Sequence, residues 1–184
     1  MPPKDGEKTG QFGLWLTGYV CSKLLDKNYT VYYDHGDPTE HSNVAAIKGF
    51  LGEKVKNENR LADVDVMVAD EDRGIKMLIE IEESPISPKT LLADVFASLL
   101  STKFAVKIGN ENIYFSKTPG TCLIVAGYNP NDKRRRFINN KVLKKLRGFL
   151  PPENAINPEQ VEFIIESDLG HCLERLRQRV REIL

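Results

Sequence analysis

The sequence lacks the features that mark several large classes of protein. It contains no apolar run near the roughly 18 residues that a membrane-spanning helix requires, which predicts a protein without a membrane partner. It has only 3 cysteines in 184 residues, and Cys21, Cys122 and Cys172 lie far apart in apolar surroundings. This spacing argues against a disulfide framework or a zinc site and favours reduced thiols in a cytoplasmic protein.

Charge of one sign is not in excess either. Lys and Arg number 26, as do Asp and Glu, so no global field attracts nucleic acid or membrane. P-loop, G-x-G-x-x-G and G-x-S-x-G sequences are missing, which argues against the usual nucleotide-binding and serine-hydrolase sites. The functional signal must therefore lie in how charged residues are distributed along the chain.

The length and the 41% hydrophobic content favour one domain with one sizeable core. We expect residues 1–10 to form a flexible N-terminal arm and residues 11–184 to form the domain. Apolar residues at three- and four-residue spacings predict helices, and alternating or β-branched runs predict strands. The predicted helices are 11–27, 42–55, 89–106, 131–149 and 167–184, and the predicted strands are 29–33, 61–70, 74–84, 112–116, 121–127 and 161–165. The last two strands before the basic helix are expected to form a hairpin through 117–120. Together these elements predict an α/β fold with a mixed β-sheet flanked by helices on both faces.

Acidic residues interrupt two of the predicted strands, which we expect to pair as an antiparallel hairpin. Alternation places Glu80 and Glu82 on one face of 74–84, and Asp63 and Asp65 on one face of 61–70. A turn centred near residue 72 would set Asp65 opposite Glu80 and Asp63 opposite Glu82. Carboxylates opposed in this way destabilise a sheet unless they are protonated or bind a cation. The pattern favours a site for Mg²⁺ or Mn²⁺ with Asp63, Asp65, Glu80 and Glu82 as ligands.

A structural reading of the same residues stays open. Charged residues in a sheet also form salt-bridge networks without any catalytic role. Asp63 can pair with the nearby Arg60, and Glu83 is expected to face away from the cluster. The metal reading leads because few cations lie near these acids in the sequence.

The runs "DVDVMV", "MLIEIEES" and "PKTLLADVFASLL" together resemble the core of the PD-(D/E)XK nuclease superfamily. The resemblance covers roughly residues 28–127 and implies a restriction-endonuclease-like fold and metal-dependent hydrolysis of a phosphodiester, with DNA as the favoured substrate. It implies that Asp65 and Glu80 are the catalytic metal ligands. We expect Glu82 to be catalytic and to bind the metal with them, and Asp63 to be an outer ligand. Glu82 stands where the family usually has Lys, which implies either a second metal ion or a member that does not cleave. The helix expected at 42–55 would be an insertion.

Positive charge is concentrated in the predicted helix 131–149. Its charged residues from 133 onward are all basic, and phosphate backbones are bound chiefly through such clusters. A solvated helix face that balances the acidic hairpin is the simpler alternative. The predicted nucleic-acid-binding residues are Lys133, Arg134, Arg135, Arg136, Lys141, Lys144 and Lys145.

The sequence therefore predicts a Mg²⁺- or Mn²⁺-dependent endonuclease. Two other classes stay open: a non-catalytic nucleic-acid-binding subunit of the same fold, and an interaction protein whose acids are salt-bridged. A homodimer with two sites on two strands is also compatible with the sequence.

Overall fold

Two long parallel strands form the centre of the sheet. In the computed structural model, which describes residues 6–37, 42–149, 156 and 158–184, β5 (Gly74–Pro85) pairs in parallel with β7 (Glu111–Tyr128). The middle of β5 and the second half of β7 are rich in Ile, Leu and Val and are buried, as parallel strands covered on both faces usually are. The other strands are β1 (Thr30–Tyr33), β2 (Ile47–Phe50), β3 (Arg60–Val64), β4 (Val66–Ala69), β6 (Lys103–Ile108) and β8 (Val161–Glu166).

The described residues form one mixed sheet of eight strands. Its order is β1-β4-β5-β7-β6-β2-β3, and β8 pairs in parallel with the second half of β7. β4 runs antiparallel to β5, and β1 runs antiparallel to β4. The α/β class and the mixed sheet predicted from the sequence are confirmed.

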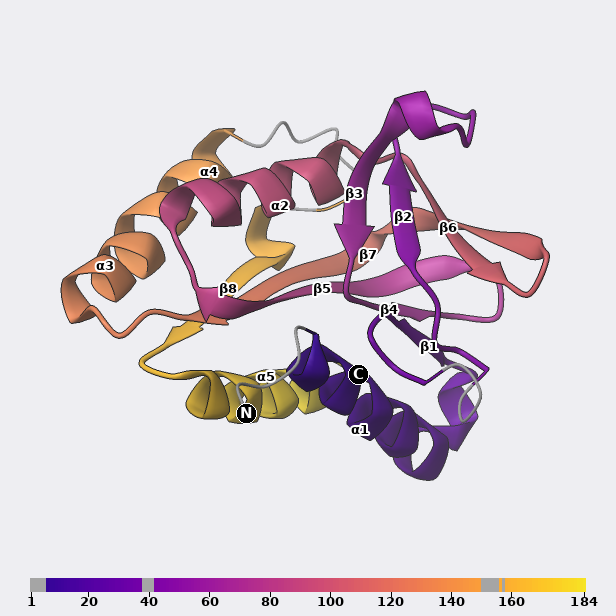
Figure 1. Cartoon of the computed structure of the whole chain (residues 1–184), viewed down its shortest axis with the longest axis horizontal. Helices are drawn as coiled ribbons and strands as arrows, with labels where there is room; N and C mark the ends of the chain where they lie inside the picture. Colours follow the sequence, from indigo (N-terminus) through magenta and orange to yellow (C-terminus); the bar gives the residue numbers. More distant parts are fainter. Residues whose placement is uncertain (1–5, 38–41, 150–155, 157) are drawn as a thin grey trace.

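Helices cover both faces of the sheet (Figure 1). Successive side chains of β5 point to opposite faces of the sheet and enter two hydrophobic clusters. Met77 and Ile79 pack with buried residues of the first and last helices, and Leu78 packs in the cluster on the other face. One face carries α1 (Glu7–Lys23) and α5 (Leu169–Ile183), and the other carries α2 (Pro88–Leu100), α3 (Asp132–Phe137) and α4 (Leu143–Phe149). No described helix is long and apolar enough to cross a membrane.

The expected helix at 42–55 is wrong, because the chain there contains strand β2. The apolar residues have helical spacing by coincidence, and the strand is held between β3 and β6 by long-range pairing. Gly49 permits this close packing, since a Cβ at that position would lie 2.4 Å from the Ser101 Oγ. Local periodicity cannot report a ladder formed with residues that are distant in sequence.

The region between residues 89 and 127 also differs from the prediction. The helix ends at Leu100, and residues 103–108 form β6 instead of its last turns. The expected hairpin at 117–120 is wrong: β7 runs through these residues, and its register with β5 shifts between Ile75 and Met77 so that 118–121 bulge. The true hairpin joins β6 to β7 at Gly109, whose φ of 60° suits glycine.

The first helix begins earlier than expected. α1 starts at Glu7, and both Thr9 and Gly10 are buried, so residues 7–10 belong to the fold and not to a flexible arm. Residues 1–5 of the predicted arm lie outside the described residues. The predicted strand at 29–33, the β4–β5 hairpin, the basic helix, β8 and the last helix are confirmed.

Candidate active site

The candidate site lies where β4 ends and β5 continues. β4 pairs with β5 only as far as Val66 opposite Ile79, which places Asp65 alongside Glu80 as the sequence predicts. The backbone amide of Ile81, the residue after Glu80 on β5, donates a hydrogen bond of 2.6 Å to the Asp65 Oδ2. The Asp65 carbonyl in turn accepts from the Asp34 N–H at 2.9 Å. Asp65 therefore completes the sheet edge with its side chain, where β3 turns away from β5.

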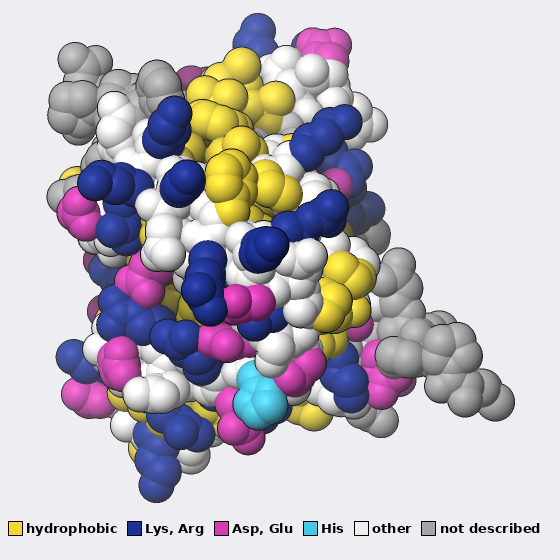
Figure 2. All heavy atoms as spheres, turned by 90° about the vertical axis from the view of Figure 1, so that its left-hand side faces the viewer, with side chains coloured by type: hydrophobic (Ala, Val, Ile, Leu, Met, Phe, Trp, Pro, Cys, Tyr) yellow, Lys and Arg dark blue, Asp and Glu magenta, His cyan; other side chains and the backbone are white. Residues whose placement is uncertain are grey.

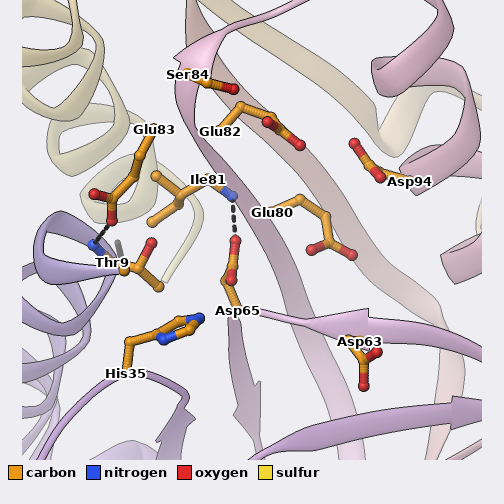
Figure 3. Close-up of a pocket in the computed structure, with 11 residues that line it drawn as sticks. Thr9, His35, Asp63, Asp65, Glu80, Ile81, Glu82, Glu83, Ser84 and Asp94 are labelled. Carbon is orange, nitrogen blue, oxygen red and sulfur yellow. Dashed lines mark hydrogen bonds between the residues drawn. The ribbon is translucent and has the colours of Figure 1, made fainter. Parts of the chain in front are cut away.

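A pocket of about 400 Å³ opens at this edge, between the N-terminus of α1 and helix α2 (Figure 3). Its described lining contains no Lys or Arg, and His35 is the one basic side chain among it. The acidic lining residues are Asp63, Asp65, Glu80, Glu82, Glu83 and Asp94.

Glu80 is the most deeply buried acid of the pocket. It is 7% exposed and points toward α2, because it shares the β5 face of Leu78. The Ser98 hydroxyl donates a hydrogen bond of 2.9 Å to its Oε1. Burial, and then repulsion by Asp65, raise the pKa of Glu80 well above its usual range. This hydrogen bond opposes the shift but leaves the carboxylate with a net cost of ionisation.

Asp65 is shifted for the same main reason. Burial raises its pKa from 3.8 to about 6, and the negative charges of Asp34 and Glu82 add to this. The Ile81 amide and the nearby His35 act in the opposite direction. The fold therefore holds a second carboxylate in a place where its charged form is disfavoured.

Asp94 on α2 is a site residue that the sequence analysis missed. Burial, and then the neighbouring Glu82, raise the pKa of Asp94 from 3.8 to about 7. Its Oδ2 is buried without a hydrogen-bond donor, because the facing Glu82 carboxylate offers none. The neighbouring Glu82 carboxylate therefore favours the protonated form of Asp94. Its spacing in the sequence could have indicated it, because Asp94 lies one helical turn before Ser98 and one turn after the apolar Leu91, on the face of α2 that is buried.

Asp63 and Glu83 are oriented differently from the other acids. Asp63 does not face Glu82, as the sequence predicted: it lies on β3 opposite Lys48 and pairs with Arg60 at the rim of the pocket. The register prediction failed because the expected strand 61–70 breaks at Asp65 into two strands with different partners. Glu83 faces away from the cluster and accepts a 2.7 Å hydrogen bond from the Thr9 amide, in the first turn of α1.

The structure argues against the salt-bridge reading for the inner acids. No described Lys or Arg lies within ion-pair distance of Asp65, Glu80, Glu82 or Asp94. The donor set suits a hard divalent cation, which prefers carboxylate oxygens, and the unpartnered Asp94 Oδ2 is an available ligand. As the side chains lie, however, no three His, Cys, Asp or Glu within the described residues are placed to hold a metal ion. Binding a cation would therefore need rotation of side chains in the pocket.

The predicted basic helix forms as α3, a π-helical turn (Ile138–Val142) and α4. Asn131 caps it, accepting from the Arg134 amide at 3.1 Å. Figure 2 shows this end of the molecule, where Lys and Arg surround a strip of hydrophobic side chains. Five of the predicted cations are exposed and have no acid within ion-pair distance among the described residues: Lys133, Arg134, Lys141, Lys144 and Lys145.

The other two predicted cations are engaged within the fold. Arg135 donates to the Asn129 carbonyl at 2.7 Å and pairs with Asp132 at 3.2 Å. Arg136 pairs with the same Asp132 at 2.7 Å but remains exposed. Arg135 therefore serves mainly to fix the start of the helix.

Comparisons with known proteins do not assign the chain to a family. No protein-family model, curated sequence or solved structure matches it.

Proposed function

We propose that the protein is a Mg²⁺- or Mn²⁺-dependent endonuclease with a restriction-endonuclease-like fold, acting on DNA. The observation that carries the proposal is the cluster of one buried acid, Glu80, with the half-buried Asp65, Glu82 and Asp94, none of which has a described Lys or Arg within ion-pair distance. The fold proposal is supported by the order of elements, in which a β4–β5 hairpin is followed by α2 and by β7 parallel to β5. The β2–β3–β6 strands would then be an addition to that core.

In the proposed site Asp65, Glu80 and Glu82 would hold one or two metal ions, with Asp94 as a further ligand. The metal would act as a Lewis acid, lowering the pKa of an attacking water and stabilising the leaving oxygen. The protein itself supplies orientation. The Ile81 amide fixes Asp65, and the Ser98 hydroxyl fixes Glu80. Asp63 stays a proposed outer ligand, since it lies at the rim and would have to leave Arg60.

The exposed cations of α3 and α4 would bind the phosphate backbone. Phosphate contacts position a nucleic acid without reading its sequence, which suits flexible lysines on a helix surface. Replacing both Lys144 and Lys145 with Gln should weaken DNA binding. It should also reduce the slope of log binding constant against log salt concentration by about 1.4 to 1.8 in magnitude.

The decisive experiment is cleavage of labelled single-stranded, duplex and branched DNA in Mg²⁺, Mn²⁺ or EDTA. Wild-type protein should cleave with a divalent ion, and Glu80→Gln should not. Glu58→Gln is the matched control, because Glu58 is exposed and remote from the pocket lining. Cleavage that persists in Glu80→Gln would exclude this pocket as the catalytic centre.

A non-catalytic nucleic-acid-binding subunit is the second candidate. Two observations favour it: Glu82 occupies the place of the family's Lys, and the described acids do not converge on a metal position. Salt-sensitive DNA binding with no cleavage under any of these conditions would support this candidate over the first.

A further inference from the structure

The arginines of α5 fall into two groups that face different neighbours. Arg175 and Arg179 face β8, where they pair with Glu166 and Glu162; the Arg179 Nε to Glu162 Oε2 distance is 2.7 Å. Arg179 also pairs with Glu182 at 3.0 Å. These two guanidinium groups are neutralised and tie the helix to the edge of the sheet.

Arg177 and Arg181 face α1 instead. Their guanidinium carbons lie 5.5 and 5.3 Å from the centre of the Trp15 ring, and Arg181 also lies 5.9 Å from that of Tyr19. No acid of the described chain comes within ion-pair distance of either group. The Arg177 Nε is also buried without an acceptor. Like charges four residues apart on a helix repel, so the aromatic rings offset only part of the cost of this pair.

The pair borders a cavity of about 770 Å³ between α1 and α5. Ser167 and His171 add hydrogen-bonding groups to its wall, and Glu174 is the one lining acid without an ion-pair partner in the described chain. A guanidinium fork with an unused donor is suited to an anion with several oxygens, such as a phosphate.

One end of this cavity, at Glu166, lies at the same edge of the sheet as the acidic pocket. Pro85 at the end of β5 pairs with Tyr128 of β7, and Tyr128 pairs with Glu166 of β8, which lines the cavity. Two strand spacings separate β5 from β8 there, or about 10 Å. Helix α1 joins the two places, since Thr9 lines the acidic pocket and Trp15 lines the cavity.

We propose that Arg177 and Arg181 form a second phosphate-binding site, which holds the backbone of a nucleic-acid strand outside the acidic pocket. The anion site follows from the two unneutralised guanidinium groups, whereas the identity of its occupant rests on the proposed function.

Trp15 makes the site directly observable, because it is the only tryptophan of the chain. Its fluorescence is followed during titration with single-stranded oligothymidylate, with a methylphosphonate analogue of neutral backbone and with inorganic phosphate, all in EDTA. The oligothymidylate should change the emission and the neutral analogue should not. Binding is thereby measured without cleavage and without metal.

Variants assign the response to the two arginines. Replacing Arg177 and Arg181 together with Gln should weaken oligothymidylate binding about tenfold or more and lower the salt slope by about 1.4. Replacing both with Lys keeps the charge and should restore part of the affinity, which guards against a folding defect. The control is the Lys27→Gln, Lys54→Gln pair, which removes the same charge from exposed positions and should bind like wild type.

The outcomes separate this proposal from the nuclease itself. Glu80→Gln should keep the Trp15 response while losing any cleavage, so failure of the catalytic proposal leaves the anion site testable. An emission response to inorganic phosphate with none to the oligothymidylate would overturn the proposal in favour of a small phosphorylated ligand. Equal binding by wild type and the Gln double variant would overturn it as well.

Discussion

The acid cluster should make the metal-free protein less stable as pH rises from 5 to 8. A carboxyl group whose pKa is higher in the folded than in the unfolded chain holds its proton longer when folded. The folded state then binds more protons than the unfolded state, so the free energy of unfolding falls as pH rises to the folded pKa. Asp65, Glu80 and Asp94 all have raised pKa values and act in this direction.

The pKa values set the size of the effect. As pH rises from 5 to the folded pKa of Asp65, about 6, this group lowers the free energy of unfolding by about 1.4 kcal/mol. The folded pKa of Asp94, about 7, would correspond to a fall of about 2.7 kcal/mol in the free energy of unfolding. Solvent screens this partly exposed side chain, so we expect about half of that, or about 1.4 kcal/mol. The expected fall is about 3 kcal/mol, and Glu80 adds to it in the same direction.

Urea unfolding at several pH values in EDTA measures this fall, and Glu80→Gln tests its cause. Gln cannot ionise, so the variant is spared the cost of a charge at position 80 beside Asp65 and Asp94, and its stability should fall less steeply than that of wild type as pH rises to 8. Mn²⁺ at about 100 times its Kd should restore about 2.7 kcal/mol to wild type at pH 8 and much less to the variant.

Two other groups bear on the same measurement. The pKa of His171 is raised, first by its hydrogen bond to Asp168, so its stabilisation is present at low pH and is lost as pH rises through the folded pKa. The His171→Asn substitution is therefore introduced into both wild type and Glu80→Gln, so that His171 does not contribute to the measured pH dependence. Burial lowers the pKa of Lys117 to about 8, which leaves this group largely protonated over most of the range. A free energy of unfolding that is flat or rises from pH 5 to 8 in the His171→Asn variant with Glu80 intact would refute the reasoning.

Three further substitutions test the site and its frame. Asp94→Asn should stabilise the metal-free protein at pH 8 and weaken Mn²⁺ binding, as measured by thermal unfolding at increasing Mn²⁺; unchanged Mn²⁺ dependence would remove Asp94 from the ligand set. Ser98→Ala should cost about 1 to 3 kcal/mol in urea unfolding at pH 8, because the buried Glu80 loses its donor; a neutral effect would mean that water replaces the hydroxyl. Gly10→Ala should cost about 3 kcal/mol, because its Cβ would lie 2.0 Å from the His35 carbonyl oxygen, and a stable variant would contradict this packing.

The sequence predicted best where neighbours in the chain are also neighbours in space. The β4–β5 hairpin follows from alternation and a short polar turn, and its register brings Asp65 to Glu80. Asp63 was misplaced because nothing local shows that the chain changes partner at Asp65. Strand β2 was mistaken for a helix for a related reason, since its pairing with β3 and β6 is invisible to periodicity.

Asp94 illustrates a different limit. Its helix was predicted correctly over most of its length, but the way α2 docks on the sheet depends on packing across β5 and β7. Only that docking brings Asp94 to Glu82 and Ser98 to Glu80. Pattern reading identified acids on two adjacent strands but could not identify the helix residue that completes the cluster.

The acids of the pocket differ in how freely they can respond to a ligand. Asp65 is held by the Ile81 amide and takes the place of a missing strand residue, so moving it would leave a backbone donor unpaired at the sheet edge. The Asp94 Oδ2 has no hydrogen-bond partner among the described residues, and the neighbouring Glu82 carboxylate favours the protonated form of Asp94 by raising its pKa. A metal ion entering the proposed site would therefore meet two carboxylates held by hydrogen bonds, Asp65 and Glu80. The groups that reorganise around it would be Glu82 and Asp94, because no hydrogen bond between described residues holds either carboxylate.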